Sequence, residues 1–96
     1  EQPDPNTVYI DGESATSPLR VRAWRPGDRI QPLGMDGEKK LQDIFVDRHI
    51  VRSERATIPL FFSDTCCLWA AGLILSHRAR LTPQTRRIVR LFIRPQ

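Results

Sequence analysis

The chain has 96 residues, of which 40% are hydrophobic and 27% charged, so it is long enough for one folded domain and too apolar to be disordered. No apolar run approaches the roughly 18 residues that span a bilayer, and no signal peptide is present, so neither membrane insertion nor secretion is indicated. The net charge of +4 permits an anionic partner without requiring one.

The N-terminal segment is predicted to be a linker that leads into a short strand. The chain begins with Glu1 rather than Met, and its acidic, proline-bearing start is typical of a linker within a longer protein. Val8-Tyr9-Ile10 then favours a strand that ends at the turn pair Asp11-Gly12. We expect residues 1–16 to hold this linker and strand, and residues 17–96 to form a single domain.

A strand with one largely cationic face is predicted over residues 19–24. Successive side chains of a strand point to opposite faces. One face would therefore carry Leu19, Val21 and Ala23, and the other Arg20, Arg22 and Trp24. Pro26-Gly27-Asp28 ends the strand in a turn where Gly27 can adopt a positive φ. Pro32 and Gly34 keep the next residues irregular.

One main helix is predicted over residues 38–48, with Asp36 as its cap. Its apolar residues recur with helical spacing, at Leu41, Ile44 and Phe45. Lys39 and Lys40 would lie near the positive end of the helix dipole, which is an unfavourable place for cations. Either they are simply solvated or an anion from outside compensates for their position.

The second half of the chain predicts a short helical turn at Glu54-Arg55 and then strands over residues 60–63, 68–75 and 88–93. Gly72 is expected to form a bulge or a point of close backbone approach. In the last strand Val89, Leu91 and Ile93 point one way, and Ile88, Arg90 and Phe92 the other. Strands on both sides of a central helical pair predict an α+β fold rather than a doubly wound sheet.

Cys66 and Cys67 are adjacent, so they cannot easily form a disulfide with each other, and their spacing matches no zinc site. In such an apolar run they are interpreted as small core residues. Unpaired cysteines favour a reducing, cytoplasmic location.

Positive charge is concentrated in the C-terminal third. Residues 65–96 carry six arginines and no carboxylate, a net +6, whereas residues 1–64 carry nine basic and eleven acidic groups, a net −2. Thirteen of the 15 cations are arginine, whose planar fork binds phosphate bidentately. This composition indicates either a phosphate-binding surface or a genome that favours arginine codons.

The sequence gives no credible active site. It has no phosphate-cradling glycine loop, and His49 and His77 lack a neighbouring nucleophile of a recognisable type. The carboxylates are not paired in any visible way, and we expect neither a catalytic residue nor a bound metal.

The most informative segment surrounds the turn at Gly27-Asp28. It gathers five cations around a turn and a predicted helix start: Arg22, Arg25, Arg29, Lys39 and Lys40. Asp28 could pair with Arg25 or Arg29, either only to brace the turn or also to position an arginine for phosphate.

These residues resemble a known family. The pattern Arg-x-Trp-Arg-Pro-Gly-Asp-Arg-x-x-Pro-Leu-Gly is followed by Lys-Lys-Leu-x-Asp-x-Phe, by Arg55 before Ile58-Pro59-Leu60, and by Leu68-Trp69-x-x-Gly72-Leu73. Together they resemble the C-terminal domain of tRNA(Ile)-lysidine synthetase. Val51 and Cys66-Cys67 depart from the usual pattern. The positions carried over as nucleic-acid contacts are Arg22, Arg25, Arg29, Lys39, Lys40 and Arg55, with Gly27, Asp28 and Gly34 organising the turns.

The resemblance implies a domain that holds an isoleucine tRNA with a CAU anticodon on its acceptor-stem side. The parent enzyme would use ATP, with Mg²⁺, to join lysine to the wobble cytidine. Its catalytic Ser-Gly-Gly-x-Asp-Ser loop does not occur here, so no cofactor is expected on this chain. The implied fold has small mixed, sandwich-like sheets related to a domain of the phenylalanyl-tRNA synthetase β subunit. The alternative is a module that docks onto the other domains of the parent or forms a homodimer.

Overall fold

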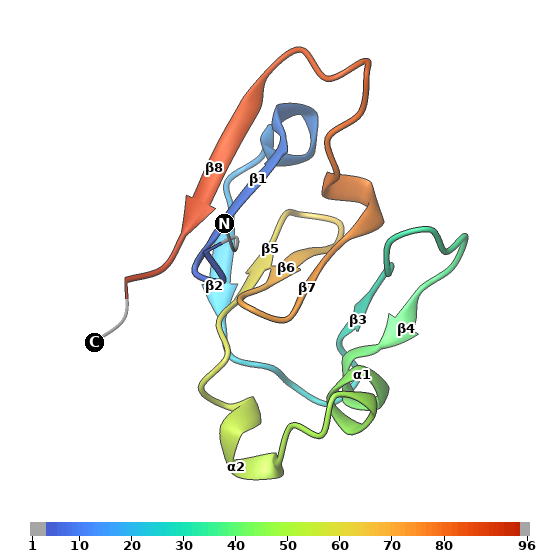
Figure 1. The fold of residues 1–96 in the computed structure, drawn as a ribbon, viewed down its shortest axis with the longest axis vertical. Coiled ribbons are helices and arrows are strands. Elements are labelled where there is room, and N and C mark those ends of the chain that lie inside the picture. Colours follow the sequence, from blue (N-terminus) through green and yellow to red (C-terminus); the bar gives the residue numbers. More distant parts are fainter. Residues whose placement is uncertain (1–3, 95–96) are drawn as a thin grey trace.

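The computed structural model describes residues 4–94, and in this range the fold is α+β, as predicted (Figure 1). The strands form three small antiparallel sheets, with orders β1-β8, β2-β5-β6-β7 and β3-β4. The strands are β1 (Thr7–Asp11), β2 (Arg20–Arg22), β3 (Arg29–Ile30), β4 (Lys39–Lys40), β5 (Leu60–Phe62), β6 (Cys67–Ala70), β7 (Ile74–Leu75) and β8 (Ile88–Phe92). The helices are α1 (Leu41–Asp47) and α2 (Arg52–Arg55), with 3-10 turns at Gly12–Ala15 and His77–Ala79.

The four-stranded sheet is the central layer, because its two inner strands, β5 and β6, are buried on both faces. Leu60 and Phe62 of β5 point to one hydrophobic cluster and Phe61 to the other. Phe61 pairs with Trp69 but Phe62 pairs with Cys67, so Leu68 is the extra residue of a β-bulge. The bulge lets Leu68 and Trp69 face the same cluster.

The two clusters place the other elements on opposite sides of the central sheet (Figure 1). The first lies under the β3–β4 ribbon and α1, and contains Ile30, Leu41, Ile44, Phe45, Leu60, Phe62, Cys67 and Ala70. The second lies under the β1–β8 ribbon, and contains Ile10, Phe61, Leu68, Trp69, Ala71, Ala79 and Leu91. Cys67 is thus a core residue, as predicted, whereas Cys66 is only half-buried, beside the second cluster.

The helix begins later than predicted, and Asp36 is not its cap. Lys39–Lys40 form β4 and pair with β3, so their backbone is extended, and Lys40 is the N-cap residue without a side-chain cap bond. The first helical N–H, from Leu41, donates to the carbonyl of Asp28 at 2.9 Å. Strand pairing therefore prevails over the helical periodicity at residues 39–40.

The end of α1 is a Schellman motif. The N–H of Ile50 donates to the carbonyl of Phe45, and the N–H of His49 to that of Val46. His49 has a φ of 58°, the left-handed conformation that this position requires. Ile50 then packs against the first cluster, which directs the chain into α2. The helical turn predicted at Glu54-Arg55 is confirmed as α2.

The prediction of a single strand over residues 68–75 is wrong, because this segment forms two strands, β6 and β7. The N–H of Leu73 donates to the carbonyl of Ala70 at 2.9 Å, and Gly72 has a φ of 75°. This turn reverses the chain, so Ala70 pairs with Ile74. Gly72 therefore serves a hairpin turn rather than a bulge inside one strand.

The strand predicted over residues 19–24 is β2, which covers only Arg20–Arg22, and the face predicted to be largely cationic is partly covered. Val21 is exposed, whereas Arg22 and Trp24 are half-buried. The guanidinium of Arg22 lies over the ring of Phe62, and Trp24 meets Phe45 edge to face, with centroids 5.6 Å apart. An arginine and a tryptophan cover the edge of the core because their side chains are long and have large flat surfaces.

The N-terminal strand and the last strand pair over five positions, from Thr7 opposite Phe92 to Asp11 opposite Ile88. The predicted faces of the last strand are confirmed. Leu91 is buried and Val89 packs on the second cluster, whereas Ile88 and Phe92 are exposed.

Candidate functional site

The basic segment is organised around a tight turn at residues 25–28. The N–H of Asp28 donates to the carbonyl of Arg25 at 3.1 Å, with Pro26 second and Gly27, at φ 95°, third. This is the pattern of a type II turn, which requires a positive φ at its third residue. A Cβ added to Gly27 would meet nothing within 4 Å, so backbone conformation rather than packing requires glycine there.

Asp28 pairs with Arg22, not with the side chain of Arg25 or Arg29 as expected. Nη1 and Nη2 of Arg22 donate to Oδ2 and Oδ1 of Asp28 at 2.8 and 2.9 Å. Oδ2 also accepts the backbone N–H of Arg25 at 2.7 Å. The two paired side chains are only 26% and 12% exposed. Because Arg22 also stacks on Phe62, this ion pair fastens the turn to the core.

The pairing of Asp28 with Arg22 favours the charged form of both side chains. Burial by itself would raise the pKa of the Asp28 carboxyl, but the hydrogen bonds from Arg22 and from the backbone of Arg25 outweigh it and hold that pKa below its usual range. The bond to Asp28 in turn raises the pKa of Arg22. Both groups are therefore ionised at neutral pH and neutralise each other, so Arg22 adds little charge to the surface.

Arg29 and Lys40 are brought side by side. They lie directly opposite each other in the β3–β4 ribbon, and both are exposed. Their neighbours Ile30 and Lys39 occupy the other face, where Ile30 is fully buried. Opposed like charges destabilise an antiparallel pair. One exposed contact, from Arg29 Nε to Glu38 Oε1 at 3.9 Å, offsets this repulsion only in part.

Two of the other predicted contact residues are engaged within the domain. Lys39 forms an ion pair with Asp47 of α1. Arg55 donates from Nε to the carbonyl of Ile50 at 3.2 Å, and its guanidinium lies 5.4 Å from the centre of the Phe45 ring. Lys39 and Arg55 therefore hold α1 and α2 in place, and are not positioned like Arg29 and Lys40.

Arg20 was not singled out from the sequence as a contact, but it lies beside the same surface. It lines, with Gly27, Arg29 and Phe62, a shallow hollow of about 260 Å³ between the turn and the β5–β6 loop. The alternation in the predicted strand over residues 19–24 placed Arg20 on a cationic face. It did not indicate that this face lies next to the turn. We define the basic turn surface as Arg20, Arg25, Arg29 and Lys40.

Gly34 organises the loop between β3 and β4. Its φ is 79°, and its N–H donates to Nδ1 of His77 at 3.0 Å. The loop is further held by the N–H of His77, which donates to the carbonyl of Gln31, and by Arg78, whose Nε donates to Oε1 of Gln31. The β3–β4 ribbon is thus tied to the 3-10 turn at His77–Ala79.

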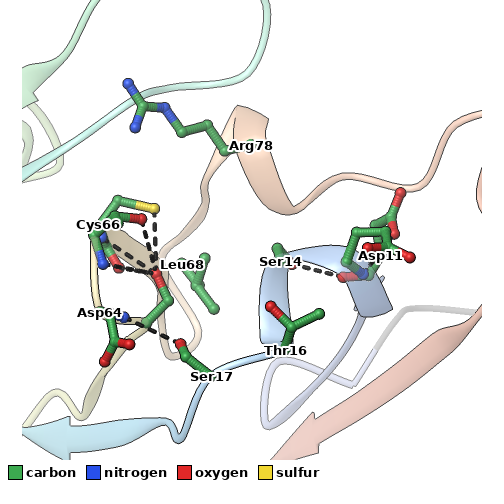
Figure 2. A pocket seen from close by; sticks show the side chains of 11 residues that line it. Asp11, Ser14, Thr16, Ser17, Asp64, Cys66, Leu68 and Arg78 are labelled. Atoms are coloured by element: carbon green, nitrogen blue, oxygen red, sulfur yellow. Dashed lines mark hydrogen bonds between the residues drawn. The ribbon is translucent and has the colours of Figure 1, made fainter.

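A second hollow, of about 460 Å³, lies between the first 3-10 turn, the β5–β6 loop and Arg78 (Figure 2). Its walls carry hydroxyl groups and the carboxylates of Asp11, Glu13 and Asp64. Arg78 points away from these hydroxyls (Figure 2), toward Gln31. Both hollows are lined by three carboxylates. In the first, Asp28 and Glu38 are in ion pairs and two arginines, Arg20 and Arg29, belong to the lining, whereas the second has one arginine, which points outward.

The remaining chemistry in the described part of the chain is limited. Burial raises the pKa of the Cys67 thiol to about 12, which leaves it protonated and unreactive. Residues 4–94 contain no group of three His, Cys, Asp or Glu side chains that could hold a metal ion. Within the same range, no helix has the length and apolar character needed to cross a membrane.

Comparison with known proteins places this geometry in context. Residues 19–91 match the family model described as the TilS substrate C-terminal domain. The chain is 44% identical over 86 residues to the tRNA(Ile)-lysidine synthase of Geobacter sulfurreducens, and 41% identical over 87 residues to that of Symbiobacterium thermophilum. These alignments cover 90% and 91% of this chain but only 18% of each relative.

Among solved structures, the chain is similar to one described as the crystal structure of the TilS C-terminal domain. The TM-score is 0.74 at 32% sequence identity, and the match covers 99% of this chain and 76% of that one. The two therefore share the arrangement of sheets and helices described above.

Proposed function

Because this chain belongs to the TilS substrate C-terminal domain family, we propose that it is the tRNA-binding accessory domain of a tRNA(Ile)-lysidine synthetase. It positions the isoleucine tRNA with the CAU anticodon, on the acceptor-stem side, and performs no chemistry itself. ATP and Mg²⁺ serve a catalytic domain of the cytoplasmic parent enzyme, which joins lysine to the wobble cytidine. This chain's own sequence has no phosphate-cradling glycine loop for ATP.

The observation that carries the proposal is the like-charged pair Arg29 and Lys40, opposed on neighbouring strands. Such a pair is costly in the isolated domain and becomes favourable beside an anion. Arg25 on the turn and Arg20 beside the hollow extend the same charge. Since the bases of an A-form stem are hidden in a deep, narrow groove, proteins recognise it largely through phosphates, 2′-hydroxyls and shape.

The Arg22–Asp28 pair supports the proposal in a different way. The pair fixes the turn that carries Arg25. The backbone carbonyl of Asp28 also accepts the N–H of Leu41, which fixes the end of β4 that carries Lys40. Cations on a rigid frame lose less conformational freedom when they bind, so the same charges bind phosphate more tightly. We therefore assign Arg22 and Asp28 to positioning, and Arg25, Arg29, Lys40 and Arg20 to contact.

The test is the binding of the chain to an RNA hairpin stem at several salt concentrations, followed by fluorescence anisotropy. Log K falls as log salt rises. If Arg25 and Lys40 each contact one phosphate, Arg25→Ala and Lys40→Ala should each make this slope less steep by about 1. Arg80→Ala is the control, because it removes the same charge from an exposed residue beside the second 3-10 turn. If all three variants bind like the unaltered chain at every salt concentration, the basic turn surface does not contact the stem.

One observation favours a second function, docking onto other domains of the parent or dimerisation. Leu33 and Met35, in the loop between β3 and β4, are exposed apolar residues. Sedimentation of the chain with and without tRNA separates the two. A stable dimer that ignores tRNA supports docking, whereas a monomer that co-sediments with tRNA supports the accessory-domain function.

A further inference from the structure

The outer face of the β1–β8 ribbon carries a second surface that the proposed stem contact does not use. Tyr9, Ile88 and Phe92 are 52%, 59% and 43% exposed, although they belong to paired strands. Arg90 and Arg94 lie among them on the same chain segment. We call these five residues the ribbon face. Exposed apolar residues gathered in one place mark interaction sites more often than scattered ones do.

The ribbon face lies on the opposite side of the central sheet from the basic turn surface. The inner side chains of the ribbon, Ile10 and Leu91, pack on the second cluster, whereas β3 and α1 pack on the first (Figure 1). A straight RNA stem seated on the turn therefore does not also cover the ribbon. Whatever the ribbon face binds is a different part of the ligand or a different ligand.

The ribbon face combines flat rings with guanidinium groups. The guanidinium carbon of Arg90 lies 4.8 Å from the centre of the Phe92 ring, and that of Arg94 lies 6.0 Å from it. Arg90 is also directly opposite Tyr9 in the ribbon, and Phe92 is therefore a diagonal neighbour of Tyr9. Two aromatic rings and two guanidinium groups thus lie together, with Arg94 just beyond the end of β8.

Neither Arg90 nor Arg94 forms an ion pair within residues 4–94, and the nearby carboxylates, although still charged, accept hydrogen bonds from other groups. Asp11, opposite Ile88, accepts from the N–H of Glu13 and from the hydroxyl of Thr85. Asp4 accepts from the N–H of Asn6 and from the hydroxyl of Thr7. A ligand that complements the face is flat, apolar on its faces and negatively charged along its backbone.

We propose that the ribbon face binds unpaired nucleotides of RNA by stacking their bases on Tyr9 and Phe92, with Arg90 and Arg94 at the phosphates. Exposed bases stack on aromatic rings and arginine planes, whereas bases inside a stem are already stacked on each other. A protein partner would also cover the apolar residues, but two arginines with no ion pair within residues 4–94 favour a polyanion.

The experiment compares two fluorescent probes. One is a single-stranded RNA of about eight nucleotides, which is within the usual range of site sizes. The other is a blunt-ended RNA hairpin whose loop is a non-nucleotide linker, so that it has no unpaired base. The double variant Tyr9→Leu/Phe92→Leu keeps the charge and most of the apolar surface but removes both rings. We expect it to bind the single strand roughly tenfold or more weakly, since each stacked base contributes that order of affinity, and to bind the hairpin unchanged. Tyr9→Phe keeps a ring and should bind the single strand nearly as well as the unaltered chain.

The outcomes separate this proposal from the accessory-domain function. Thermal unfolding first shows whether the double variant is folded. If the folded variant binds the single strand as tightly as the unaltered chain, the ribbon proposal is overturned. It is also overturned if the unaltered chain binds only the hairpin, or if the rings matter only for self-association in sedimentation. If the single strand binds through the rings and the hairpin does not bind, the ribbon proposal holds and the stem contact fails.

Discussion

The basic turn surface and the ribbon face both present cations, but they hold them by different means. At the turn, the geometry of Arg25 and Lys40 depends on one ion pair, Arg22–Asp28, and on a glycine with a positive φ. In the ribbon, Arg90 stands on a regular strand whose inner side chains are buried, and Arg94 follows just after the end of that strand. Both guanidinium groups lie near the exposed ring of Phe92. Changes at the turn should therefore affect folding and binding together, whereas changes on the ribbon face should affect binding with little effect on folding.

The largest effect is expected from Asp28→Ala. This change leaves the half-buried Arg22 without its carboxylate and the N–H of Arg25 without its acceptor, so the free energy of unfolding should fall by about 2–3 kcal/mol. Urea denaturation measures it. Asp36→Ala is the matched control, because Asp36 is exposed, and it should change stability by less than about 0.5 kcal/mol. Equal losses in the two variants would show that the turn is not held by the ion pair.

Acidification should also remove the stability that the Asp28 carboxylate contributes. The pKa of Asp28 is lower in the folded chain than in the unfolded one, where it is about 3.9, so its contribution to stability is present above that pH and is lost as the pH falls through the folded pKa. The difference in stability between the unaltered chain and Asp28→Asn should be constant near neutral pH and should shrink below about pH 4. If the difference in stability is the same at pH 2 as at neutral pH, the charge of Asp28 is not what stabilises the turn.

A smaller effect is expected from Gly27→Ala, which forces a side chain into a backbone conformation at φ 95° without creating a clash. We expect a loss of about 1–2 kcal/mol in stability, together with weaker hairpin binding, since Arg25 lies on the same turn. Gly37→Ala is the control, because a Cβ there also meets nothing within 4 Å and its φ is not positive. Thermal unfolding of the two variants measures the difference.

The smallest effect on stability should come from the ribbon. Arg90→Ala removes one cation–π contact with Phe92 from an exposed surface, which should cost about 0.5–1 kcal/mol at most. If the loss instead equals that of Asp28→Ala, the ribbon face is part of the folding core, and the contrast between the two regions disappears.

The sequence was informative wherever local chemistry decides the structure. The Pro26-Gly27 pair predicted a turn because only glycine readily takes the positive φ, and the alternation over residues 88–93 predicted the correct buried face. The α+β class and the family resemblance followed from the order and spacing of such segments. These signals need no knowledge of what lies far away in the chain.

Where partners are distant, the sequence could not decide. Lys39–Lys40 look like the start of a helix until β3 supplies strand partners, and Asp28 has three arginines nearby in sequence but forms its side-chain pair with Arg22, which Phe62 holds in place. A side chain adds charge to the surface only if no neighbour neutralises it, and neighbours are set by the packing of the two clusters. The sequence by itself thus determined that the chain is basic, of one family and of α+β class; the tertiary structure decided which cations are used for folding and which face solvent.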